Sequence, residues 1–237
     1  HFEKRYSLKY PNSLGLWYSA MTQRLDLKPQ EDEYILMGMA GWGSVNEELK
    51  QNIRKDFFND SDKPIDLKNN LHRGCLSWDS EVYPDDGSDE WKFDIAANVQ
   101  AICEEEIVKV FELTKKLVPE TDNCVYMGGV ALNCVANSII ARDHYPNLWI
   151  LPNPGDAGSS LGSAAYVYGK HINWTSPFTG YDIKGKYPTE QVLYELLGGN
   201  IVGIANGRAE FGPRALGNRS LIADPRGDDI KDKVNEI

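Results

Sequence analysis

The sequence predicts an α/β fold, chiefly because helical and strand-like segments alternate between residues 96 and 169. Apolar residues at helical spacing give way to a short apolar run and then to glycines, and this order occurs twice. Hydrophobic residues make up 41% and charged residues 25% of the 237 positions, which is ordinary for a globular protein. A chain of this length forms one large domain or two modest ones.

The first part of the chain is expected to be mainly helical. Apolar spacing predicts helices at 14–24 and 45–56. Residues 31–43 run from apolar side chains into glycines, so we expect a strand or a helix end followed by a turn. The stretch 59–95 is rich in Asp, Pro, Gly and Trp and is interpreted as an irregular insertion.

The clearest predicted helix covers 96–117, where glutamates come early and lysines late, as the helix dipole favours. Pro119 ends it. We expect a strand at 123–127, then two glycines, and then a helix to about residue 142. This order is typical of an α/β unit.

The second part of the chain continues the alternation. A strand is predicted at 148–151 and a helix of small residues at 158–169. The segment 172–187 contains prolines and glycines and is predicted to be a loop at a domain boundary. A helix at 188–197 and a strand at 200–205 follow, and the polar end suggests a domain that is incomplete here.

Charge and composition narrow the class of protein. The formal net charge of −10 argues against nucleic-acid binding, which needs a basic face. No apolar run approaches the roughly 20 residues needed to span a bilayer. The four cysteines lack metal-ligand spacing and are interpreted as reduced thiols of a cytoplasmic protein. Because the first residue is His1 and no signal peptide is recognisable, we expect a processed or truncated chain.

The first chemically informative segment is CVYMGGVALNCVAN, residues 124–137. Gly128 and Gly129 lie where a strand gives way to a helix, so the backbone can turn sharply and a ligand can come close. The helix start offers N–H groups suited to phosphate, and Asn133 and Asn137 would share a face. The alternative is a tight turn without a ligand.

The second segment is PNPGDAGSSLGSAA, residues 152–165. Asp156 lies beside a glycine at an expected helix start. Its carboxylate is a candidate helix cap or, alternatively, a ligand for a hard cation or a group in a nucleotide site. The four histidines show no ligand spacing.

The third segment, residues 207–220, is the least ordinary. Arg208, Arg214 and Arg219 alternate with glycines. Guanidinium groups match phosphate and carboxylate geometry, and glycines let peptide N–H groups join in. Ser220 adds a further hydrogen-bonding group. We therefore predict an anion site, with a solvated basic loop as the alternative.

Together these segments resemble the carbamoyltransferase family of nodulation-factor and aminoglycoside O-carbamoyltransferases. The resemblance covers residues 10–226 and rests on the stretches SLGLWYSAMT, EYILMGMAGWG, YMGGVALNCVAN, PGDAGSSLGSAA and EFGPRALGNRSLIADPR. It implies part of an actin-like ATPase (ASKHA-type) domain at 1–175, followed by the start of a YrdC-like α/β domain at 176–237. It also implies that ATP and carbamoyl phosphate give carbamoyl-adenylate, from which the carbamoyl group passes to an acceptor hydroxyl.

The resemblance also assigns residues. The nucleotide-binding set is Gly128, Gly129, Val130 and Asn133. The set on the carbamoyl-phosphate side is Arg214, Arg219 and Ser220. Asp156 corresponds to a ligand of a divalent metal, iron or magnesium, whose other ligands lie outside this chain. Neither nucleic acid nor membrane is an expected partner.

The chain also departs from the family's pattern. It lacks the first phosphate loop and the histidine pair of the actin-like domain, and most of the YrdC-like domain. We therefore expect the isolated 237 residues to be inactive. The alternatives are an actin-fold sugar kinase or ATPase and a non-catalytic nucleotide-binding fragment. Feeding carbamoyl phosphate and measuring pyrophosphate release separates the kinase from the carbamoyltransferase.

Overall fold

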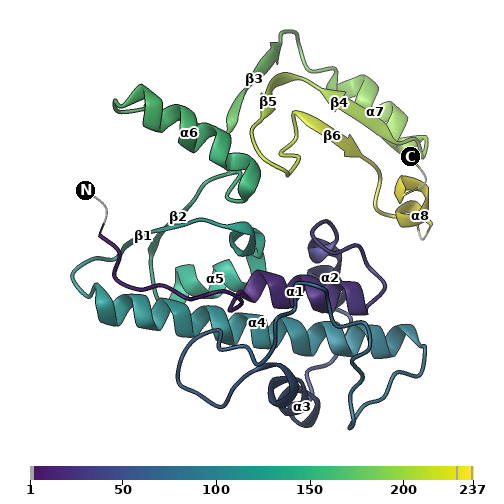
Figure 1. Cartoon of the computed structure of the whole chain (residues 1–237). Coiled ribbons are helices and arrows are strands. Elements are labelled where there is room, and N and C mark those ends of the chain that lie inside the picture. Colours follow the sequence, from purple (N-terminus) through teal and green to yellow (C-terminus); the bar gives the residue numbers. More distant parts are fainter. Residues whose placement is uncertain (1–2, 228, 236) are drawn as a thin grey trace. The chain divides into compact units, whose positions relative to one another are not determined.

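The computed structural model describes residues 3–227, 229–235 and 237 (Figure 1). The chain divides into two compact units, one up to Ile150 and one from Leu151 onward. This division lies ahead of the loop 172–187 in which we expected a boundary. Helices alternate with short strands, in agreement with the predicted mixture of helix and sheet.

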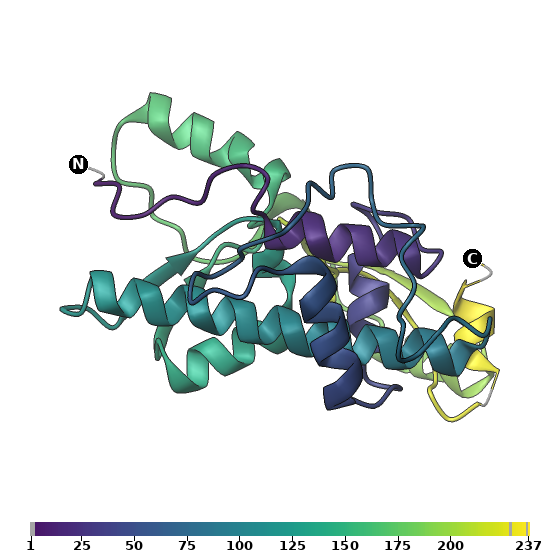
Figure 2. The same ribbon diagram turned by 60° about the horizontal axis from the view of Figure 1, so that its bottom comes forward.

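The first unit is built around one long helix, α4 (Asp89–Leu117). Helices α1 (Leu14–Arg24), α2 (Glu33–Met39), α3 (Glu47–Phe57) and α5 (Cys134–Asp143) all pack against it. Figures 1 and 2 both show α1 running alongside α4. The presence of α1 and α3 confirms two predicted helices, and α2 resolves the choice between strand and helix in favour of helix.

Helix α4 begins earlier than the predicted start at residue 96, so that prediction was wrong. The Ser88 hydroxyl accepts a hydrogen bond from the Trp91 N–H at 3.0 Å, which caps the helix. Asp89 and Glu90 occupy the first turn, where the helix dipole favours negative charge. Trp91 and Ile95 are at most 1% exposed, so this additional part of the helix is held by the core.

Aromatic side chains fill the core between α1, α3 and α4. Trp17 is fully buried, and its ring lies 5.1 Å from that of Phe58 in an edge-to-face arrangement. Phe57 contacts the same indole. Such pairs add about 1 kcal/mol beyond the free energy of burying their area. The helices of the first unit are therefore fixed by tertiary packing.

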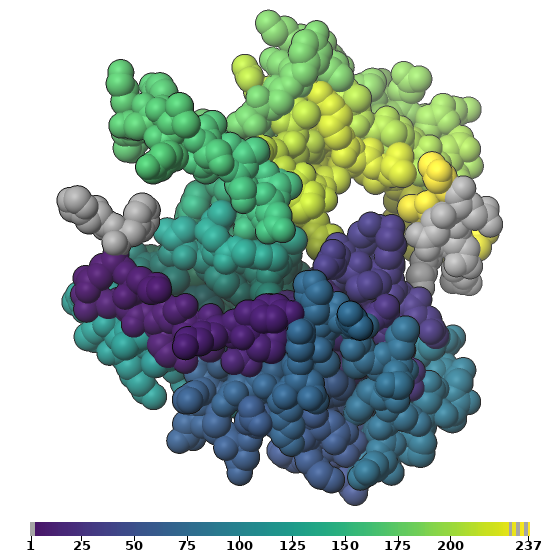
Figure 3. Space-filling view, viewed as in Figure 1, coloured from purple at the N-terminus to yellow at the C-terminus, as the bar shows by residue number. Residues whose placement is uncertain are grey.

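The segment between α3 and α4, residues 58–88, is mostly irregular, as predicted, apart from a bridge between Phe58 and Leu67. In Figure 3 the blue atoms of the first unit belong to α3 and to this segment. It is held by side chains of the neighbouring helices: the Trp78 indole N–H donates to Asp56 at 2.9 Å, and the Ser80 hydroxyl donates to Asn52 at 2.7 Å.

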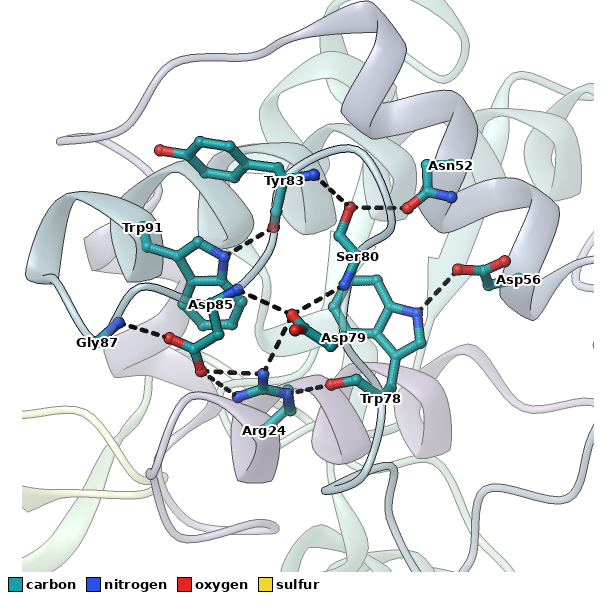
Figure 4. Close-up of polar contacts among 10 residues, drawn as sticks. All are labelled: Arg24, Asn52, Asp56, Trp78, Asp79, Ser80, Tyr83, Asp85, Gly87 and Trp91. Atoms are coloured by element: carbon teal, nitrogen blue, oxygen red, sulfur yellow. Dashed lines mark hydrogen bonds and ion pairs between the residues drawn. The ribbon is translucent and has the colours of Figure 1, made fainter.

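Arg24, the last residue of α1, is the main anchor of this segment (Figure 4). Its guanidinium donates to the carbonyl oxygen of Trp78 and, through both terminal nitrogens at 3.0 Å, to the Asp85 carboxylate. It also lies over the Trp91 ring, 4.7 Å from the centroid. A planar fork meets several partners at once, including Asp79 at 3.6 Å, which an ammonium group cannot do.

We expect Arg24→Lys to destabilise the first unit by about 2 kcal/mol, since charge-assisted hydrogen bonds and the stacking contact are lost. Segment 72–88 should then become more sensitive to limited proteolysis. Arg73→Lys is the matched control, because Arg73 is exposed within the same segment. Equal cleavage rates in the two variants would contradict the anchoring role of Arg24.

The first unit also contains a two-stranded parallel sheet. Strand β1 (Asn123–Tyr126) pairs with β2 (Asn147–Ile150), so both predicted strands are confirmed. They are connected by a 3-10 turn, η1 (Gly129–Leu132), and by α5. The single helix expected after the two glycines is therefore divided in two.

The second unit contains two antiparallel pairs. Strand β3 (Phe178–Ile183) pairs with β5 (Gly207–Glu210), and β4 (Val202–Ala205) pairs with β6 (Arg219–Ile222). The loop predicted at 172–187 is therefore interrupted by β3, which the prediction missed, whereas residues 172–177 and 184–187 are loop as expected. The partner of β3 comes from a distant part of the sequence, so local composition did not reveal the strand.

The helices of the second unit are α6 (Ser159–Tyr168), α7 (Thr189–Leu197) and α8 (Ile230–Asn235). Helices α6 and α7 confirm predictions, whereas α8 lies in the end that we described only as polar. Among the described residues, no helix is long and apolar enough to cross a lipid bilayer.

Candidate functional site

The predicted nucleotide-binding turn follows β1 in the first unit. Gly128 has φ +112°, in the region that favours glycine. Gly128 and Gly129 are exposed, and a Cβ on either would meet nothing within 4 Å. The side of the backbone on which a side chain would stand is therefore unobstructed at these two glycines.

Asn133 has a structural role in the same turn. Its side chain is 9% exposed and caps α5 by accepting from the Ala136 N–H at 3.1 Å. It also exchanges two hydrogen bonds with the Gln100 amide of α4, at 3.0 and 3.1 Å. Val130 packs against the core of the unit. Both side chains thus hold the turn in place.

Asn137 of α5 contacts the same turn. Its Nδ2 donates to the carbonyl oxygen of Ala131 at 2.8 Å. Its Oδ1 is buried and has no hydrogen-bond partner among the described residues. Such an atom costs free energy unless something else contacts it.

Asp156 belongs to the second unit, where it begins the 3-10 turn η2 (Asp156–Gly158). It is exposed, and no side-chain hydrogen bond caps η2 or α6. Within the part of the chain that the structure describes, no group of three His, Cys, Asp or Glu side chains could hold a metal ion. Asp156 therefore does not form a metal site with other described residues.

The arginine segment, residues 207–220, lies directly against the Pro/Gly loop that leads to Asp156. A Cβ built on Gly212 would lie 2.5 Å from the carbonyl oxygen of Pro152, and Gly212 has φ +128°. No other residue fits this close approach without a shift. Two of the three informative segments are thus neighbours in the second unit, whereas the glycine turn belongs to the first unit.

The segment folds around a carboxylate of its own. One oxygen of Glu210, Oε1, accepts from the peptide N–H groups of Leu216, Asn218 and Arg219 at 2.9, 2.8 and 3.2 Å. Desolvation raises the pKa of Glu210, but these backbone hydrogen bonds outweigh it and lower the pKa to about 2. The carboxylate is therefore ionised at neutral pH.

Arg219 donates to backbone carbonyl oxygens. Its Nη1 contacts those of Asn206 and Asn218, and its Nη2 those of Tyr181 and Gly207, at 2.7 to 3.3 Å. It thereby joins the strands of both antiparallel pairs.

Ser220 accepts from the Gly217 N–H at 3.0 Å. Arg208 and Arg214 are exposed. The three predicted residues thus lie in one folded segment. Arg214 is exposed, and Arg219 and Ser220 form hydrogen bonds with backbone groups.

Sequence reasoning gave Glu210 no role. The signal was present, since an acidic residue lies within the glycine- and arginine-rich run. Peptide N–H groups gathered by glycines form a concavity for anions, and an acid of the same chain can fill it. We had predicted that a ligand would use these N–H groups.

The structure is a mixed helix-and-sheet protein whose glycine- and arginine-rich segment folds around Glu210. Comparison with family models matches residues 2–165 to "Carbamoyltransferase N-terminus" and residues 194–237 to "Carbamoyltransferase C-terminus". The chain therefore belongs to the carbamoyltransferase family, which confirms the resemblance seen in the sequence.

Individual relatives agree with this assignment. An uncharacterized protein of Synechocystis sp. is 30% identical over 97% of this chain and 44% of its own length. A 3'-hydroxymethylcephem-O-carbamoyltransferase of Amycolatopsis lactamdurans is 32% identical over 58% of this chain. Nodulation protein NolO of Bradyrhizobium diazoefficiens is 27% identical over 95% of this chain and 46% of its own. The chain thus spans less than half the length of these relatives.

Proposed function

We propose that this chain is part of an ATP-dependent O-carbamoyltransferase that acts on carbamoyl phosphate and a hydroxyl-bearing small molecule. The supporting observation is the segment 207–220, which is folded around Glu210 and carries exposed arginines. Family membership gives the reaction class. The relatives named for carbamoyl transfer, the cephem enzymes, favour a hydroxyl acceptor.

The proposed chemistry has two steps. In the first, carbamoyl phosphate, ATP and one water molecule yield carbamoyl-adenylate, pyrophosphate and phosphate. Water takes up the donor's phosphoryl group, and the released carbamate oxygen attacks the α-phosphorus of ATP and expels pyrophosphate. The acceptor hydroxyl then attacks the carbamoyl carbon, loses its proton and expels AMP. A guanidinium group that holds the donor's phosphate neutralises charge where the first bond breaks.

We assign the parts of the chain as follows. The peptides of Gly128 and Gly129, held by Val130 and Asn133, contact the adenylate in an actin-like domain. Arg214 contacts the donor phosphate on the YrdC-like side, with Arg219 and Ser220 fixing the backbone around it. The proposal includes a divalent metal with Asp156 as one ligand.

The test measures products. The full-length protein is incubated with carbamoyl phosphate and ATP, and carbamoyl-adenylate is followed by mass spectrometry together with pyrophosphate release. Arg214→Ala should lower formation of the adenylate about 10- to 100-fold, because a charge-assisted hydrogen bond contributes roughly 1.5–3 kcal/mol.

Arg142→Ala is the matched control. Arg142 is exposed at the end of α5, where it pairs with Asp143 in the first unit. The Arg142→Ala variant should form carbamoyl-adenylate at the wild-type rate. Wild-type turnover that yields ADP without pyrophosphate would indicate a kinase and contradict the proposal. Nucleotide binding without any product would favour a non-catalytic role.

A further inference from the structure

The N–H groups of the arginine segment are already engaged by Glu210. Three peptide N–H groups of the loop after β5 converge on one carboxylate oxygen. The Asn218 amide closes the same loop by donating to the Arg208 carbonyl oxygen at 2.9 Å. These contacts span the segment from its first strand to the start of β6.

A carboxylate held in this way fixes the loop from within the chain. Ionised acceptors form stronger hydrogen bonds than neutral ones, and each N–H contributes to a fixed loop shape. Gly212 and Gly217, at φ +128° and +108°, supply backbone conformations that the loop needs. The loop between these glycines carries Arg214.

We propose that Glu210 is a positioning residue, which fixes the arginine segment around its own carboxylate and so sets the place of Arg214 for the carbamoyl donor. The inference rests on the proposed function of this segment. It replaces our earlier expectation that the peptide N–H groups bind the donor directly. The donor's phosphate then contacts side chains of the segment. Glu210 holds the backbone of the segment and does not contact the donor.

The two arrangements predict opposite effects of removing the charge. If the N–H groups were the donor's own site, Glu210 would compete with the phosphate and repel it. Glu210→Gln would then strengthen donor binding. If Glu210 positions the segment, the same substitution weakens donor binding, because a neutral amide oxygen holds the three N–H groups less firmly.

The experiment uses the full-length protein and measures initial rates of pyrophosphate release at varied carbamoyl phosphate and at varied ATP. For Glu210→Ala we expect the KM for carbamoyl phosphate to rise at least tenfold, with the KM for ATP within twofold of wild type. Glu210→Gln should show a smaller rise, because its side-chain oxygen still accepts. Glu190→Ala, which removes an exposed charge from α7 of the same unit, is the control.

Each outcome has a defined meaning. A lower KM for carbamoyl phosphate in Glu210→Gln, or an unchanged KM in both Glu210 variants, overturns the positioning role. Equal rises in both KM values overturn it as well, since a general loss of structure would affect both substrates. Absence of carbamoyl-adenylate in the wild type instead refutes the proposed function, so the two failures are distinguishable.

Discussion

Glu106→Ala is expected to lower the free energy of unfolding of the first unit by about 3 kcal/mol. Glu106 lies on α4 and is 1% exposed. Its carboxylate accepts from Arg54 Nη1, from Lys109 Nζ and from the Ile65 N–H, each at 2.8 Å. Truncation leaves a buried N–H without its partner and removes one contact of a largely buried guanidinium, while a cavity opens in the helix interface.

The measurement is urea unfolding followed by the fluorescence of the buried Trp17 and Trp91. Glu112→Ala is the matched control, because Glu112 is an exposed acid on the same helix and its loss should change stability by less than about 0.5 kcal/mol. A similar small change for Glu106→Ala would show that the buried network contributes no stability.

The same carboxylate gives a pH dependence with a definite sign. Desolvation raises the pKa of Glu106, but Lys109, Arg54 and the Ile65 N–H outweigh it, so the pKa is lower than the ordinary 4.5. A lowered folded-state pKa stabilises the protein above the unfolded-state pKa, and this contribution is lost as the pH falls through the folded-state pKa. The acid loss of stability should therefore be shallower in Glu106→Gln than in wild type.

The predictions that succeeded depended on local patterns. Helices α1, α3, α6 and α7 follow from apolar spacing, and β1 and β2 follow from short apolar runs between turn residues. The start of α4 was wrong because Ser88, Trp91 and Ile95 lie in a stretch that composition describes as irregular. There the cap and the tertiary burial of two side chains decided the outcome.

Features that depend on pairing between distant residues could not be predicted. Strand β3 forms because β5 accompanies it, with Phe178 opposite Glu210 and Asp182 opposite Arg208. The carbonyl partners of Arg219 come from three separate places in the chain. The arginines and glycines of residues 207–220 predict an anion-binding segment. Only the folded chain shows that Glu210 already accepts hydrogen bonds from peptide N–H groups of this segment.

The glycine at position 158 gives the second large expected effect. It is buried within the turn that begins at Asp156, and a Cβ built there would lie 1.9 Å from the carbonyl oxygen of Asn153. This oxygen belongs to the backbone and cannot rotate away. We expect Gly158→Ala to destabilise the second unit by about 2–3 kcal/mol through overpacking.

Gly162→Ala, one turn further along in α6, should have the opposite sign. A Cβ at Gly162 meets nothing within 4 Å, and alanine is favoured over glycine in a helix by about 0.5–1 kcal/mol. Chemical denaturation followed by the fluorescence of Trp174, in the second unit, compares the two variants.

Because Pro152, which precedes Asn153, lies against Gly212, the Gly158 variant should also raise the KM for carbamoyl phosphate while the Gly162 variant leaves it unchanged. Equal free energies of unfolding of both variants would show that the loop around Asp156 shifts to accept the Cβ without loss of stability. It would then not support the arginine segment.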